Sequence, residues 1–276
     1  MKMILLSVVA TAALSATAFA ADLPARTYTK APVVVDPHYS WSGFYVGGNV
    51  GGAWNRDSGG AGCIDPAGVR NGPVCQMVPA GTIDASGVMG GVQIGYNWQV
   101  APSWLLGVEA DIQGADIKGS TTINGPFTFA SGAVSLIAAQ YTASEKLDWF
   151  GTVRGRVGAT VGNVLLYATG GLAYGHAELT ANLTSPNPFA FPASASVTRV
   201  GWTAGAGVEW GFAGNWSVKV EGLYYDLGTT SLAAGPVAGS VAGALGFIRT
   251  KDFDLHGAIG RVGVNYRFGG PVVAKY

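Results

Sequence analysis

The feature that most constrains the fold is a period of two in hydrophobicity, which runs through residues 147–161 and 164–179. In the first run, apolar residues fall on one face, while Arg154 and Arg156 fall on the other. A helix would place apolar residues at a period near 3.6, so both runs predict β-strands. Gly162-Asn163 joins them, and both residues tolerate the positive φ that a two-residue hairpin turn requires.

Strands this long, with one apolar and one charged face, are typical of a membrane-spanning wall. Soluble sheets have a modal strand length of about 5–6 residues. The chain is 49% hydrophobic and only 12% charged, and that charged share is about half of the soluble norm. After the N-terminus it has no apolar run long enough for a transmembrane helix. A transmembrane β-barrel resolves the conflict, because its strands expose apolar residues at every second position.

The N-terminal residues 1–20 predict a secretory signal peptide. Lys2 supplies the positive charge, Ile4–Leu14 the short apolar core, and Ala18–Ala20 the cleavage site. A membrane anchor is disfavoured because the apolar core is too short to span. Residues 21–40 carry three prolines and no sustained alternation, which predicts a periplasmic lead-in.

The chain has two cysteines, Cys63 and Cys75, in a segment rich in Pro and Gly. Export implies an oxidising compartment, so we predict that they form a structural disulfide. Closing a loop of this size is worth roughly 3 kcal/mol in the chain-entropy model. A metal site is the weaker alternative because no histidine lies near them.

Eight alternating segments follow, joined by three short turns and four long loops in strict alternation. The predicted strands are Trp41–Asn55, Ala85–Gln99, Trp104–Lys118, 147–161, 164–179, Val197–Phe212, Trp216–Thr230 and Lys251–Phe268. An even number of antiparallel strands closes without a free edge. The sequence therefore predicts an all-β, eight-stranded antiparallel transmembrane β-barrel over residues 41–268, with short periplasmic turns, four long extracellular loops and a tail at 269–276.

Aromatic residues support this orientation, because they gather near both ends of the predicted strands. One group maps to the short-turn end: Trp41, Phe44, Trp98, Trp104, Phe212, Trp216, Tyr266 and Phe268. A second group maps nearer the long loops: Trp54, Trp149, Tyr174, Trp202 and Tyr224. Two aromatic girdles a membrane thickness apart are typical of outer-membrane barrels.

Several blocks together resemble the porin-family outer-membrane proteins of alphaproteobacteria, the small immunogenic barrels of Brucella and rhizobia within the OmpA-like superfamily. The blocks are Trp41–Trp54, Leu165–Gly175, Gly201–Phe212, Ser217–Gly228 and Arg261–Phe268. The resemblance implies the outer membrane of a Gram-negative cell, with outer-membrane lipid and the barrel-assembly machinery as partners. It also implies an assembly signal at Arg261, Gly263, Tyr266 and Phe268. The tail departs from this pattern, so either Phe268 or Tyr276 is the recognised aromatic residue.

The inward faces of the strands predict a charged network in the lumen, which side chains should fill in a barrel of eight strands. Its members are Glu109, Asp111, Arg154, Arg156, Glu209, Lys219, Glu221, Arg261 and Arg267. Pairing outward from the turn at 213–215 puts Glu209 opposite Lys219. Pairing from the shared periplasmic end of two other strands puts Glu109 near Arg156 and Asp111 near Arg154. Buried charges need partners, so we expect a salt-bridge plug and a structural barrel that supports the envelope. A small porin, whose pairs open to pass ions, is the alternative.

Other functions have weaker support. His176 and His256 lie near the long-loop ends of strands that are three apart in the ring, and both face outward, so an acyl-transfer enzyme is not expected. His38 lies in the lead-in. The loops suit surface display, and the resemblance includes relatives that bind haemin or host surfaces, although no haemin motif is evident. We expect no cofactor, no metal and no nucleic-acid partner; a homo-oligomer stays open.

Overall fold

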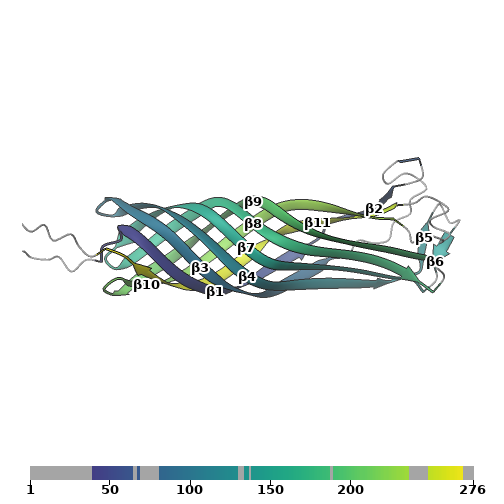
Figure 1. The fold of residues 1–276 in the computed structure, drawn as a ribbon, viewed down its shortest axis with the longest axis horizontal. Helices are drawn as coiled ribbons and strands as arrows, with labels where there is room; N and C mark the ends of the chain where they lie inside the picture. The colour runs from purple at the N-terminus through teal and green to yellow at the C-terminus, as the bar shows by residue number, and fades with distance from the viewer. Residues whose placement is uncertain are drawn as a thin grey trace, which may run out of the picture. The chain divides into compact units, whose positions relative to one another are not determined.

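The chain forms a closed ring of eight long antiparallel strands (Figure 1). We describe it from a computed structural model. The residues that the structure describes are 39–64, 67–68, 81–129, 134–136, 138–186, 189–235 and 248–269. The predicted signal peptide, most of the lead-in and nearly all of the tail therefore lie outside the described residues.

The strands follow one another around the ring in chain order. The long strands are β1 (Gly43–Asp57), β3 (Ile83–Ala101), β4 (Trp104–Asn124), β7 (Gln140–Val161), β8 (Val164–Ser185), β9 (Phe189–Ala213), β10 (Trp216–Ala234) and β11 (Ile248–Arg267). The short strands are β2 (Ala61–Ile64), β5 (Phe127–Phe129) and β6 (Val134–Leu136). The first and last long strands pair with each other, with Tyr45 opposite Arg267, so the sheet has no free edge along the barrel. The predicted fold class is confirmed.

Three tight turns join strands at one end of the barrel. Val161 pairs with Val164 across Gly162-Asn163, and Gly162 has a φ of 57°. Gly214 takes a similar φ of 53° between β9 and β10. Positive φ carries little steric penalty in glycine, so these turns form where the sequence predicts them.

The long strands extend well beyond their predicted extracellular ends. β8 and β9 stay paired as far as Ser185 opposite Phe189, so the loop predicted at 181–196 is largely a hairpin. Pro192, which we expected in that loop, lies within β9 opposite Asn182. Likewise, β4 and β7 are paired through much of the loop predicted at 119–146. These loop boundaries are corrected.

The cause is an inversion of the hydrophobic pattern along each strand. In the first half of β8, outward Leu166 and Leu172 are 51% and 59% exposed, whereas in the second half inward Leu179 and Leu183 are fully buried. A strand of 22 residues that is tilted by about 40° from the barrel axis extends about 55 Å along that axis. This is roughly twice the height of the apolar band of an outer-membrane barrel, about 25 Å. The extracellular half is therefore a water-surrounded barrel with an apolar core, polar outside and apolar inside.

The two aromatic girdles mark the limits of the membrane segment. On the turn side, exposed rings include Phe44, Trp98, Trp104, Phe212, Trp216 and Phe268; Trp54, Trp202 and Tyr224 are exposed on the other side. Trp41 is an exception, because it is only 2% exposed and packs with Leu105, Leu165 and Tyr39 in the periplasmic end of the lumen. Its odd position gives it the inward phase of Tyr45, so its assignment to the girdle was wrong.

Candidate functional site

A charged layer fills the lumen within the membrane segment. It contains four carboxylates and four cations, each at most 4% exposed: Glu109, Asp111, Glu209 and Glu221 with Arg154, Arg156, Lys219 and Arg261. Their positions follow from strand alternation, because each lies on the face opposite the lipid-facing aliphatic residues. The charges balance, so the layer can be internally neutral.

Arg154 and Arg261 connect three of the four carboxylates. Arg154 forms ion pairs with Glu109, Asp111 (3.1 Å) and Glu221 (3.0 Å). Arg261 donates from Nε to Glu221 Oε2 at 2.7 Å and from Nη2 to Asp111 Oδ2 at 2.9 Å. Multiple hydrogen bonds to ionised groups are the strong ones, so these two arginines hold strands on several sides of the barrel together.

Lys219 and Arg156 complete the layer. Lys219 Nζ donates to both carboxylate oxygens of Glu109, at 2.8 and 2.9 Å. Arg156 Nη1 lies 3.2 Å from Glu209 Oε2, and its guanidinium stacks over the ring of Tyr45 at 4.9 Å. Each buried charge in the layer thus has an opposite partner, which buried charges require.

The pairing between β4 and β7 differs from the predicted register by two residues. Glu109 lies opposite Arg154, and Asp111 lies opposite Thr152. The predicted register assumes that the two strands start level at their periplasmic ends, but neighbouring strands of a tilted barrel are staggered. Across β9 and β10, joined by a tight turn, Glu209 lies opposite Lys219 as expected. The side chain of Lys219 nevertheless contacts Glu109, across the lumen.

Arg267, which we expected in the same network, lies apart at the periplasmic rim. Its guanidinium donates to the carbonyls of Ser42 and Gly269 and to Asn215, and stacks over Tyr39 at 5.3 Å. No ion pair of Arg267 with a carboxylate is found among the described residues. Its contacts, to two main-chain carbonyls, one amide side chain and one aromatic ring, lie at the periplasmic mouth of the barrel.

The residues of the predicted assembly signal face two ways. Phe268 is 48% exposed, and its ring lies 5.1 Å from that of Tyr266 in the periplasmic girdle. Arg261 instead points into the charged layer. Recognition of this strand end by the assembly machinery stays a prediction, and Tyr276 lies outside the described residues.

Neutral polar side chains complete the charged layer, and the sequence prediction missed them. The hydroxyls of Tyr45 and Tyr167 donate to Glu109 and Glu221 at 2.7 and 3.0 Å. Asn97 accepts from Arg156 Nε at 2.8 Å, and Asn265 donates to Glu209. All four lie in the inward phase of their strands, so alternation applied to uncharged polar residues could have found them.

An apolar layer lies on the extracellular side of the charged layer. Phe150 is fully buried, and its ring centroid lies 5.1 Å from that of Tyr225. Met89, Leu223 and Ile259 are each 3% exposed and belong to the same cluster. Side chains of this size pack the lumen as a protein core packs, so a charged layer and an apolar layer fill the lumen one after the other.

Beyond the apolar layer lies a buried glutamate, Glu145, that forms no ion pair within the described part of the chain. Glu145 is 5% exposed; its Oε1 accepts from Asn55 Nδ2 at 2.6 Å, and its Oε2 has no hydrogen-bonding partner among the described residues. It lies four positions extracellular of Trp149 in the outer girdle, and so outside the membrane. Burial, with the nearby Asp57 carboxylate, raises the pKa of Glu145 to about 8.

The cations at this level are Lys251 and Arg249. Lys251 pairs with Asp57 at 2.9 Å and donates to the carbonyl of Gly59. Arg249 stacks over the ring of Tyr141 at 3.7 Å, and burial lowers the pKa of its guanidinium. The sequence prediction missed this second cluster because it assigned 56–84 and 119–146 to loops.

The remaining predicted sites do not form a catalytic centre. His176 bonds Ser196 and Thr198 at 2.9 and 3.1 Å on the outer surface, and Trp149 stacks against its ring. His256 lies on β11, where its ring neighbours Tyr224. The two histidines are therefore separate. Cys75 lies outside the described residues, so the disulfide with Cys63 stays a prediction.

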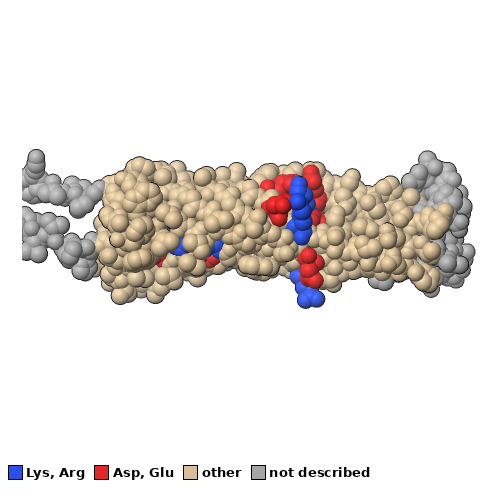
Figure 2. Space-filling model, turned by 90° about the horizontal axis from the view of Figure 1, so that it is seen from below, with Lys and Arg blue, Asp and Glu red and all other residues tan. Residues whose placement is uncertain are grey.

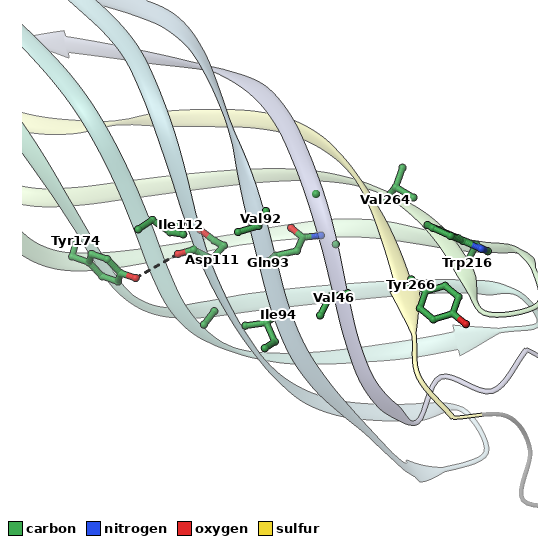
Figure 3. A pocket seen from close by; sticks show the side chains of 13 residues that line it. Val46, Val92, Gln93, Ile94, Asp111, Ile112, Tyr174, Trp216, Val264 and Tyr266 are labelled. Atoms are coloured by element: carbon green, nitrogen blue, oxygen red, sulfur yellow. Dashed lines mark hydrogen bonds between the residues drawn. The ribbon is translucent and has the colours of Figure 1, made fainter.

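A groove on the outer wall, shown in Figure 3, has mainly apolar walls. Val46, Val92 and Ile112 line it on neighbouring strands, and Tyr174 reaches across to donate to the carbonyl of Asp111 at 3.5 Å. It lies between the two aromatic girdles, where lipid hydrocarbon surrounds the barrel. Among the described residues, no group of three or more His, Cys, Asp or Glu side chains is arranged to hold a metal, and no helix is long and apolar enough to cross a membrane.

Comparison with known proteins is consistent with this architecture. Residues 6–268 match the family model of the outer membrane protein beta-barrel domain. The 31 kDa outer-membrane immunogenic protein of Brucella melitensis is 35% identical, over 97% of this chain and all of its own length. The 22 kDa outer membrane protein of Rhizobium leguminosarum bv. viciae is 31% identical, over 77% of this chain and 80% of its own. The outer membrane protease OmpT of Escherichia coli aligns over 82% of this chain and 97% of its own, with 12% identity and a TM-score of 0.41.

Proposed function

This chain belongs to the outer membrane protein β-barrel family and lies in the outer membrane, and on that premise we propose that it is a structural barrel that supports envelope integrity and does not conduct ions. A relative that is named as an outer-membrane protein matches 97% of this chain.

The observation that carries the proposal is the filling of the lumen by two successive layers. In the charged layer, the side chains of Arg154 and Lys219 are fully buried, and those of Glu109 and Glu221 nearly so. In the apolar layer, Phe150 is fully buried. An ion would have to separate paired charges and then cross an apolar constriction, and such constrictions exclude water and ions.

The paired charges also explain how the lumen stabilises the barrel. Arg154 reaches from β7 to carboxylates on β4 and β10, and Lys219 reaches from β10 to Glu109 on β4. The Arg154–Glu221 and Lys219–Glu109 pairs cross the lumen between strands that are not neighbours in the sheet. They therefore oppose flattening or splaying of a barrel that lipid surrounds, a task suited to an envelope-supporting protein.

The direct test is conductance. Purified protein in a planar bilayer should show no steady channel, and the double variant Arg154→Ala with Arg156→Ala should lower stability and still not conduct, because the apolar layer remains. Steady conductance of the wild-type protein that the double variant changes would favour the small porin. A deletion strain should become more sensitive to large hydrophobic antibiotics, and the wild-type gene should restore resistance.

We also infer that the barrel is not an enzyme. His176 contacts hydroxyl groups but no carboxylate among the contacts found in the described part of the chain. A lipid acyl-transfer assay should show no turnover. A haemin- or host-binding role would depend on loop tips that lie mostly outside the described residues, and a haemin titration without a Soret shift would remove that ligand.

A further inference from the structure

On the face that Figure 2 shows, charged side chains gather mainly in a band about midway along the barrel, with smaller patches nearer the turn end. The band follows directly after the outer aromatic girdle. On β7 the outward face passes from Trp149 to Asp148 and Lys146, and on β8 it passes from Tyr174 to Glu178. Since the girdle lies at the lipid interface, the band lies at the level of the outer-leaflet headgroups.

Within this band, two lysines face each other across neighbouring strands. Lys118 of β4 is the direct partner of Lys146 of β7, and their side chains are 58% and 38% exposed. Like charges directly opposite each other are unfavourable in a sheet. Lys118 contacts Asp116 at 2.6 Å, and Lys146 contacts Asp148. These pairs are exposed, and exposed ion pairs are held only weakly, so both ammonium groups can exchange partners.

We propose that Lys118 and Lys146 bind the phosphate of an outer-leaflet lipid headgroup between them. A phosphate offers three strongly accepting oxygens and nearly two negative charges, and each ammonium offers three donors. One phosphate would thereby relieve the repulsion that the register imposes on the pair. The membrane level of the band favours a lipid over a free anion, because the headgroup is already held at that height.

The carboxylates near the two lysines determine whether the phosphate can bind without a cation. Asp116, Asp148 and Glu178 surround the two lysines, with Glu178 Oε2 3.9 Å from Lys146 Nζ. Two positive and three negative charges leave the patch at −1. A bare phosphate would be repelled, but magnesium is commonly held by one or two carboxylates together with phosphates. The binding is therefore expected to require a divalent cation.

The test compares lipid retention in the folded barrel with magnesium present. The probes are a doubly phosphorylated glycolipid of the outer leaflet and the same glycolipid with its phosphates removed, measured by native mass spectrometry. We expect Lys118→Gln with Lys146→Gln to retain the phosphorylated lipid about tenfold less well, as loss of charge-assisted hydrogen bonds implies. Removal of magnesium should have a comparable effect.

Arg56→Gln is the matched control for the single variant Lys118→Gln. Arg56 is also an exposed outward cation of the band, but its cross-strand partner is Asp84. Equal losses in both single variants would show general electrostatic attraction and overturn the proposal. So would equal retention of the dephosphorylated lipid, or displacement by inorganic phosphate at the lipid's concentration. If the double variant fails to fold by gel mobility shift, the two single variants decide the question.

Discussion

Replacing Glu145 by glutamine should remove the part of the pH dependence of stability that arises from this buried carboxyl group. Glu145 is buried on the extracellular side of the apolar layer, accepts a hydrogen bond from Asn55 alone among the described residues, and lies near the Asp57 carboxylate. Its pKa is raised from 4.5 to about 8, first by burial and then by Asp57. Glutamine keeps an oxygen that can accept from Asn55 but cannot ionise, so the variant isolates the charge.

The sign and size follow from proton linkage. Between pH 4.5 and about 8 the folded state holds a proton on Glu145 that the unfolded state has lost. The free energy of unfolding must therefore fall as pH rises through this window, and level off above it. A difference of about 3.5 pKa units corresponds to about 5 kcal/mol, an upper limit for the gain of Glu145→Gln at pH 9. At pH 4 the two proteins should be nearly equal.

The assay is urea unfolding in lipid vesicles from pH 4 to pH 9, followed by tryptophan fluorescence. Glu178→Gln is the control, because Glu178 lies on the neighbouring strand with its side chain 55% exposed. Other carboxyl groups titrate in all three proteins, so only the difference from wild type is interpreted. A difference between wild type and Glu145→Gln that stays constant across the whole pH range would refute the reasoning.

Three further predictions test the lumen, the strand contacts and the cysteines. Arg154→Ala should lower the free energy of unfolding by about 3–5 kcal/mol, because three buried carboxylates each lose one cation partner and the buried layer keeps an unbalanced negative charge; Arg56→Gln, which removes an exposed cation, should change urea unfolding little. Gly201→Ala should lower the free energy of unfolding by about 1–3 kcal/mol, because the added Cβ would clash with the carbonyl oxygen of Asp226. Gly222→Ala, whose Cβ would meet nothing within 4 Å, should be tolerated in the same unfolding assay. Cys63→Ser with Cys75→Ser should lower the free energy of unfolding by up to roughly 3 kcal/mol. Mass spectrometry of the alkylated wild-type protein should find no free thiol, and alkylation of both cysteines would refute the disulfide.

The strand count, the turn end and the lipid face could be predicted because each depends on local pattern. Val153 and Val157 face lipid because they alternate with Arg154 and Arg156, and Gly162-Asn163 turns because of its own conformational freedom. Neither feature needs a distant residue. The same local argument places the charged side chains in the lumen.

The extracellular ends of the strands were harder to predict. The apolar face of a strand points outward where lipid surrounds the barrel and inward where water surrounds it. In β8, Leu172 faces lipid and Leu183 faces the core of the extracellular half. Alternation continues without a break, but its phase inverts beyond the girdle. A prediction that follows one apolar face stops at the inversion, and it therefore mistook paired strands for loops.

The eight strands of the wall, their lipid-facing residues and their inward charges all follow from the amino-acid sequence. Which of those charges meet depends on the closed barrel. Lys219 lies beside Glu209 in the sheet yet contacts Glu109 across the lumen, and Arg154 joins carboxylates on two other strands. The physical reason is that the period of two is a local property of each strand. Contacts across the lumen depend on the stagger of all eight strands when the barrel closes.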